Sequence, residues 1–125
     1  MLGMGKMKSR IMYIEPKGRD SHTDDAPARI GRVTFSKSGK TLRYRGRTLV
    51  RRQGFCANYV DEETGDQYWV SGCKKRGGDR LFPGIIEIDG DVREEYWLSI
   101  RETPECKEQT VIRCVGKYGG KQGRR

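Results

Sequence analysis

Apolar and polar residues alternate along two stretches, 29–35 and 41–50, and this period of two predicts a pair of antiparallel strands. Residues 37–40 join them, and a glycine in this joint can adopt the positive φ that a tight hairpin turn requires. The alternation directs one set of side chains toward a core and leaves the other set on a basic, solvent-facing side. The inner set is Val33 opposite Tyr44 and Phe35 opposite Leu42, and the outer set is Arg32, Thr34, Arg43 and Arg45.

Shorter β-patterned stretches occur on both sides of this hairpin, and turn-forming residues bound each of them. The first predicted strand is 10–15, which ends at Pro16 and Gly18 before a loop over 17–27. The strands 55–60 and 67–72 form a second hairpin with Gly65 in its turn. Two more strands are predicted, 85–88 after Pro83-Gly84 and one near 110–115.

A helical period replaces the alternation near residues 91–101, where apolar residues recur every three or four positions. Asp89 or Asp91 is a natural N-cap, and two glutamates follow in the first turn, where negative charge is favourable. Pro104 ends the pattern. We therefore predict an amphipathic helix of about three turns that covers the open end of the sheet. Its apolar stripe is Val92, Tyr96, Trp97 and Ile100.

These elements predict a mainly β chain with one C-terminal helix, folded as a small antiparallel barrel or rolled sheet. An SH3-like barrel is the first choice and an OB-like barrel is the second. The length of 125 residues fits one domain. We place that domain at residues 10–103, between a flexible tail at 1–9 and a basic tail at 104–125 that holds the strand near 110–115.

Basic and acidic residues are concentrated in different segments of the chain, and this distribution bears on its function. Residues 1–60 carry 14 basic against 4 acidic residues, residues 61–105 carry 6 against 12, and residues 106–125 carry 6 against 1. With a net charge of +9, such asymmetry favours an anionic partner, although basic strands lying beside acidic ones would satisfy part of the charge internally.

The leading hypothesis is therefore a non-enzymatic module that binds nucleic acid, the first candidate, or an acidic protein. The alternative is a protein–protein interaction or regulatory module that uses the aromatic second hairpin and the helix. The candidate anion-binding residues lie on the outer side of the first hairpin and in the glycine-rich loop after residue 72, and they are Arg32, Arg43, Arg45, Arg47, Lys74, Lys75 and Arg76.

Catalytic and metal-binding patterns are weak in this chain. The only histidine, His22, stands in a polar stretch that reads as an exposed loop. The four cysteines are 17, 33 and 8 positions apart, without the close pairs of a zinc knuckle. Cys73 precedes Lys74-Lys75-Arg76, and nearby cations lower the pKa of a thiol, so a thiol-dependent enzyme at Cys73 is a third hypothesis. We expect no enzyme activity, no cofactor and no metal site. The cysteines are Cys56, Cys73, Cys106 and Cys114.

Neither a membrane-spanning stretch nor a secretory signal is found in the sequence. We expect a cytoplasmic protein whose cysteines are reduced and whose partners exclude the membrane.

Several ordered strings in this chain resemble a family of short bacterial proteins of uncharacterised function. The strings are Ile11 to Glu15, Ala28 to Leu42, Tyr68 to Gly72 and Ile88 to Trp97, within a similarity that covers roughly residues 11–101. Members sometimes carry the name deoxyxylulose-phosphate synthase, a thiamine-diphosphate enzyme. That chemistry needs a Gly-Asp-Gly motif with an asparagine after it, whereas this chain has Asp89-Gly90-Asp91 and its only asparagine, Asn58, comes earlier. The resemblance thus implies a shared fold and no activity.

Overall fold

The computed structural model describes residues 8–18, 26–54, 56–80 and 83–114, which form one eight-stranded sheet and short helical segments. The structure confirms the mainly β fold with a barrel and a short helix near the C-terminus. The strands are β1 (Lys8–Gly18), β2 (Ala28–Phe35), β3 (Thr41–Tyr44), β4 (Arg47–Arg51), β5 (Tyr59–Asp61), β6 (Gln67–Gly72), β7 (Gly84–Ile88) and β8 (Val111–Cys114).

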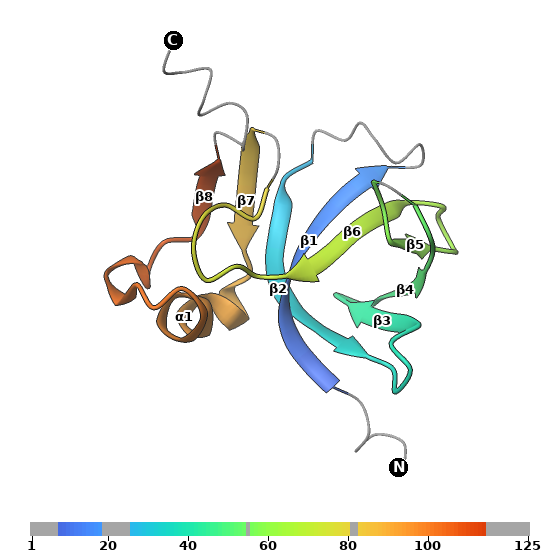
Figure 1. Ribbon diagram of the computed structural model, residues 1–125, viewed down its shortest axis with the longest axis horizontal. Helices are drawn as coiled ribbons and strands as arrows, with labels where there is room; N and C mark the ends of the chain where they lie inside the picture. The colour runs from blue at the N-terminus through green and yellow to red at the C-terminus, as the bar shows by residue number, and fades with distance from the viewer. Residues whose placement is uncertain (1–7, 19–25, 55, 81–82, 115–125) are drawn as a thin grey trace.

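The first six strands close into a barrel, because β1 pairs with β2 along one edge and with β6 along the other. Each strand of the barrel is antiparallel to the strand before it, so the order around the barrel follows the order in the chain (Figure 1). This up-and-down order differs from the Greek key of an OB-like barrel. The predicted pairing of Phe35 with Leu42 is confirmed.

Strand β2 is where the sheet forks. Its first residues pair with β7 in parallel, Ala28 with Ile86 and Ile30 with Ile88. Its last residues pair with β3 and belong to the barrel wall. β8 adds to β7 in antiparallel fashion, so β7 and β8 form a flap outside the barrel (Figure 1). Both flap strands were predicted from the sequence.

Strand β1 is buried on both faces, and each face belongs to a different core. Successive side chains of a strand point to opposite sides, so its even-numbered residues enter the barrel and its odd-numbered residues point outward. The barrel core is Met12, Ile14, Val33, Leu42, Tyr44, Leu49, Tyr59 and Val70. The outer core is Ile11, Tyr13, Ala28, Ile30, Ile86, Ile88, Val92, Tyr96 and Trp97.

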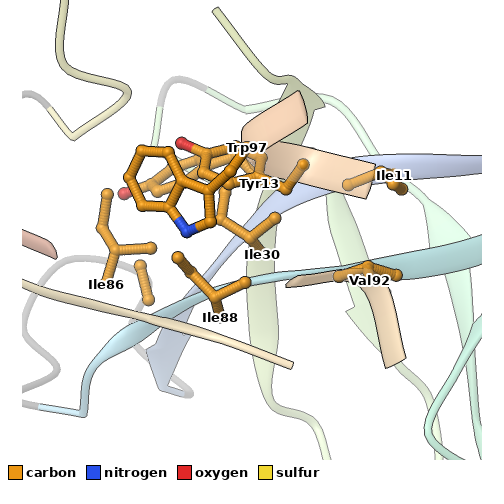
Figure 2. Close-up of a cluster of buried hydrophobic side chains, with 9 residues drawn as sticks. Ile11, Tyr13, Ile30, Ile86, Ile88, Val92 and Trp97 are labelled. Carbon is orange, nitrogen blue, oxygen red and sulfur yellow. The ribbon is translucent and has the colours of Figure 1, made fainter. Parts of the chain in front are cut away.

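The predicted helix exists, but it covers the outer core and not the open end of the sheet. Its segments are 3-10 over Gly90–Val92, α1 over Arg93–Glu95 and π over Tyr96–Ile100, and a further 3-10 turn spans Pro104–Cys106. Figure 2 shows the Trp97 ring among Ile30, Ile86 and Ile88. The indole N–H of Trp97 also donates to the Gln109 carbonyl (2.9 Å). Apolar outward residues on β1, β2 and β7 explain this position, because they need a cover.

Three strand boundaries differ from the prediction. β1 begins at Lys8 and continues through Pro16 to Gly18, and its register with β6 shifts between these two residues. The stretch 41–50 is two strands, because Arg45 and Gly46 form a tight turn with φ of 50° and 81°. Positive φ at both central positions matches the twist of a two-residue hairpin. The sequence analysis did not predict this turn, because arginine is not a residue typical of positive φ. β5 is shorter than 55–60, beginning at Tyr59.

Candidate anion-binding site

The two ends of the barrel differ in charge, and each is defined here by its turns. We call the end that holds the start of β1 and the turn 36–40 the basic end; it lies at the lower edge of Figure 1. We call the end that holds the turn Arg45-Gly46 the paired end, because its cations are bonded to carboxylates.

At the basic end, the inward-facing series of side chains changes from apolar to cationic. On β1, Lys8 and Arg10 continue the series of Met12 and Ile14, since every second residue faces the same side. On β4, Arg51 continues the series of Leu49 in the same way. These cations are exposed, whereas the apolar residues of the same series are buried, namely Met12, Ile14 and Leu49. The barrel interior therefore opens toward solvent through a cationic rim.

We define the basic rim as five exposed cations that occupy strand ends and the turn at this end of the barrel. None of the five makes an ion pair or a side-chain hydrogen bond with any residue in the part of the chain that the structure describes. Their charges are therefore available to a ligand. The basic rim is Lys8, Arg10, Lys37, Lys40 and Arg51.

A cavity of about 220 Å³ lies inside this rim, at the mouth of the barrel. Two of its walls are held rigidly: Asn58 exchanges hydrogen bonds of 2.8 Å with both backbone groups of Val70, and the Tyr59 hydroxyl donates to the Gly39 carbonyl (3.0 Å). Phe35, which is half-buried, supplies an aromatic surface. The lining residues are Met12, Phe35, Arg51, Asn58, Tyr59 and Val70.

At the paired end, the Asp89 carboxylate accepts hydrogen bonds from several side chains. The side chain of Asp89 is only 8% exposed, and it accepts hydrogen bonds from Tyr44 Oη (2.6 Å), Arg29 Nη2 (2.6 Å) and Arg45 Nη1 (3.2 Å). Arg29 also pairs with Glu87 (2.9 Å). Burial, and then the bond to Asp89, raise the pKa of Tyr44 to about 12, so its hydroxyl remains a donor at neutral pH. This network joins β2, β3 and the end of β7 where the sheet forks.

A second carboxylate, Asp61, lies at the same end of the barrel and is 5% exposed. It accepts a hydrogen bond from Arg47 Nη1 (2.9 Å) and another from the Glu63 amide (3.0 Å). Although burial opposes its charge, these bonds hold the pKa of Asp61 below its usual value. Arg47 is thereby committed to an internal partner.

The seven residues that the sequence analysis singled out do not form one surface. Four form ion pairs with carboxylates: Arg32 with Glu95 (2.6 Å), Arg45 with Asp89, Arg47 with Asp61, and Lys75 with Glu102 (3.3 Å). Three are exposed with no side-chain partner among the described residues, namely Arg43 on β3 and Lys74 and Arg76 in the loop between β6 and β7.

Sequence reasoning missed the basic rim. The signal that would have found it is the continuation of the inward-facing period past the last apolar residue of a strand, as at Lys8, Arg10 and Arg51. Cations at such positions border the barrel mouth, whereas the predicted residues came from the outward side of the first hairpin and from the loop after residue 72.

The environment of Cys73 is the opposite of the expected one. Its thiol is half-buried and donates weakly to the Ile11 carbonyl (3.7 Å). Burial, and then the carboxylate of Asp79, raise the pKa of Cys73 to about 12, so the prediction of a lowered pKa is wrong. The cations that lower the pKa of Cys73 are Arg101 and Arg10, not the three that follow it in sequence, and their effect is smaller than that of burial.

The remaining candidates for metal or catalytic chemistry add no site. His22 lies outside the described residues. Among the described residues, no three His, Cys, Asp or Glu side chains come close enough together to hold a metal ion. All four cysteines are free thiols; Cys56 is exposed, while Cys106 and Cys114 pack with Cys73 against the outer core.

No helix in the described part of the chain has the length and apolar character needed to cross a membrane. Comparison with protein-family models, with curated proteins and with solved structures found no match to this chain. The resemblance to the short bacterial family and the SH3-like assignment therefore stay predictions.

Proposed function

We propose that this protein is a non-enzymatic binding module that takes an anionic partner at the basic rim, with single-stranded nucleic acid as the first candidate. One observation carries the proposal: the inward-facing side-chain series of the barrel ends in exposed cations, unpaired within the described part of the chain, around an open mouth.

Unpaired cations are the favourable kind for phosphate binding. A cation already held by a carboxylate must give up that bond before it meets a phosphate, whereas Lys40 and Arg51 have no such bond to any residue that the structure describes. Each phosphate that a cation neutralises also releases condensed counterions, which makes the affinity depend steeply on salt. The basic rim thus supplies most of the binding free energy in this proposal.

The mouth of the barrel favours a single strand over a duplex. Modules for single-stranded nucleic acid combine cations that follow the backbone with aromatic rings on which bases stack. Phe35 is half-buried in the wall of the cavity, between rim cations on β1 and β4. A base reaches a recessed ring only when it is unpaired, so single strands fit this arrangement best.

Fluorescence anisotropy of labelled single-stranded and double-stranded RNA and DNA, titrated with the full chain at two salt concentrations, tests the proposal. The double variant Lys40→Glu/Arg51→Glu should lose binding, because it reverses two charges of the rim and removes no side-chain bond found among the described residues. The matched control is Lys107→Glu/Arg113→Glu, which reverses two exposed cations near and on β8. Equal loss in both variants, with unchanged melting temperatures, would show that the binding is generic and would sink the site.

An interaction with another protein is the second candidate function, and a specific observation favours it. Leu98, in the middle of the Tyr96–Ile100 stretch, is 45% exposed, and β8 pairs on one side only among the described strands. An exposed apolar side chain and an open strand edge are each features that suit a protein partner. A salt-insensitive partner that is lost on Leu98→Ser, with the rim variant unaffected, would favour this function over the first.

A further inference from the structure

The turn at residues 36–40 carries two cations of the basic rim, and hydrogen bonds within the turn order its backbone. The Gly39 amide donates to the Ser36 carbonyl (3.0 Å), and the Thr41 amide donates to Ser36 Oγ (3.2 Å). Gly39 has a φ of 80°, which residues other than glycine rarely adopt. The two rim cations of this turn therefore extend from a defined backbone.

A long-range side-chain bond fixes this turn to the body of the barrel. Tyr59, on β5, is only 4% exposed, and its hydroxyl donates to the Gly39 carbonyl (3.0 Å), 20 positions away in the chain. The ring of Tyr59 belongs to the barrel core. The core therefore fixes the position of the hydroxyl, and the hydroxyl fixes the position of the turn.

The end of this turn places two like charges beside each other. The Arg51 amide donates to the Lys40 carbonyl (2.8 Å), one step beyond the pairing of Thr41 with Val50. Lys40 and Arg51 are thus directly opposite each other across the hairpin, with their side chains on one face. Opposed cations repel each other, and neither of these two has a carboxylate partner among the described residues. A phosphate bound between them would remove this repulsion.

We propose that Tyr59 is a positioning residue for phosphate binding at the basic rim, because its hydroxyl holds the turn in the geometry that keeps Lys40 beside Arg51. This role rests on the function proposed for the rim. The two cations meet the backbone of a single strand without first ordering the turn, and that ordering would otherwise oppose binding. Tyr59→Phe keeps the ring and every rim cation, and it removes only the hydroxyl that bonds to Gly39.

The test compares Tyr59→Phe with Tyr44→Phe in the full chain. Each variant removes the hydroxyl of a buried tyrosine in the barrel core, but Tyr44 donates to Asp89 at the paired end. We expect Tyr59→Phe to bind a labelled single strand of thymidines about two- to tenfold more weakly, the effect of one neutral hydrogen bond. The slope of log affinity against log salt should stay unchanged, because no cation is lost. Tyr44→Phe should lose at least as much stability and keep the wild-type affinity.

A second pair of variants disturbs the same turn without changing Tyr59. A Cβ at Gly39 or at Gly46 meets nothing within 4 Å, and φ is 80° at one and 81° at the other, so alanine is equally strained at both. Gly39→Ala should weaken binding with an unchanged salt slope, as Tyr59→Phe does. Gly46→Ala, in the turn at the paired end, should lower the melting temperature equally and leave the affinity unchanged.

Amide hydrogen exchange in the free protein separates positioning from direct contact with the ligand. In Tyr59→Phe the Gly39 and Thr41 amides should exchange faster, while the Gly65 amide, bonded to the Asp61 carbonyl (2.7 Å) in another turn, stays unchanged. Unchanged exchange beside a weaker affinity would mean that the hydroxyl itself contacts the ligand, and would overturn the positioning role.

The binding data can also contradict this role on their own. A wild-type affinity in Tyr59→Phe, or an equal loss of affinity in Tyr44→Phe, would overturn the role of Tyr59 and leave the function proposed for the rim intact. A wild-type chain that binds no single strand would instead remove the proposed function, and the role of Tyr59 with it. The two failures are therefore distinguishable in one set of titrations.

Discussion

The two ends of the barrel are built from the same residue types and differ in what their arginines touch. At the paired end, Asp89 and Asp61 are almost fully buried and hold Arg29, Arg45 and Arg47. At the basic end, the rim cations have no carboxylate partner among the described residues. The difference teaches that an arginine in a β-patterned sequence carries no function by itself. Its partner decides whether it stabilises the fold or remains available to a ligand.

The largest expected effect comes from removing the acceptor of the paired end. Asp89→Ala leaves Arg29, Arg45 and the Tyr44 hydroxyl without it, and we expect a loss of about 3 kcal/mol in the free energy of unfolding. The value lies at the lower end of the range for breaking a buried ion pair because the Arg29 side chain remains 29% exposed. Urea denaturation measures it, and the exposed neighbour Asp91→Ala is the control. A loss of equal size in both variants would contradict a special role for Asp89.

Steric crowding of the Asp89 network should lower the free energy of unfolding by less than removal of Asp89 does. A Cβ at Gly31 would lie 2.4 Å from Asp89 Oδ2 and 2.5 Å from Tyr44 Cε1, so both side chains must move. We expect Gly31→Ala to destabilise the fold by about 1–3 kcal/mol, as overpacking does. Gly72→Ala is the matched control, since a Cβ there meets nothing within 4 Å. Thermal unfolding of both variants, in parallel, decides whether close packing at the fork is required.

A smaller effect should appear on acidification. Because the pKa of Asp61 is lower in the folded state than in the unfolded state, its contribution is complete above the unfolded value of about 4 and is lost as the pH falls through the folded value. Denaturation between pH 7 and pH 3 should therefore give a steeper loss of stability for the wild type than for Asp61→Asn. Parallel curves for the two proteins would mean that Arg47 does not stabilise the carboxylate.

The smallest effect on the fold should come from the basic end. Arg51→Gln removes a cation whose side chain has no partner in residues 8–18, 26–54, 56–80 and 83–114, so we expect the free energy of unfolding to change by less than about 0.5 kcal/mol. Its affinity for a single-stranded oligonucleotide should nevertheless fall, and the slope of log affinity against log salt should decrease by about 1. Anisotropy at four salt concentrations gives this slope. An unchanged slope would remove Arg51 from the site.

Local patterns in the sequence were enough for most of the elements. The alternation around Val33 and Leu42 identified the first hairpin and its inner face, and the stripe through Val92 and Tyr96 identified the helical segment. The turn at Arg45-Gly46 was missed, because an arginine with positive φ leaves little trace in composition. The strands and the helical segment are local features, and a period of 2 or 3.6 residues in the sequence reports them directly.

The composition and the spacing of residues in this chain determined by themselves that it folds as a small β-rich domain with an excess of positive charge and weak signals for catalysis. Only the tertiary structure decided which charges are free. Arg45 and Asp89 are 44 positions apart, and their ion pair forms because β7 returns to pair with β2 beside the barrel. Contacts of that range depend on strand pairing and on which core each face joins, and no periodicity along the chain records them.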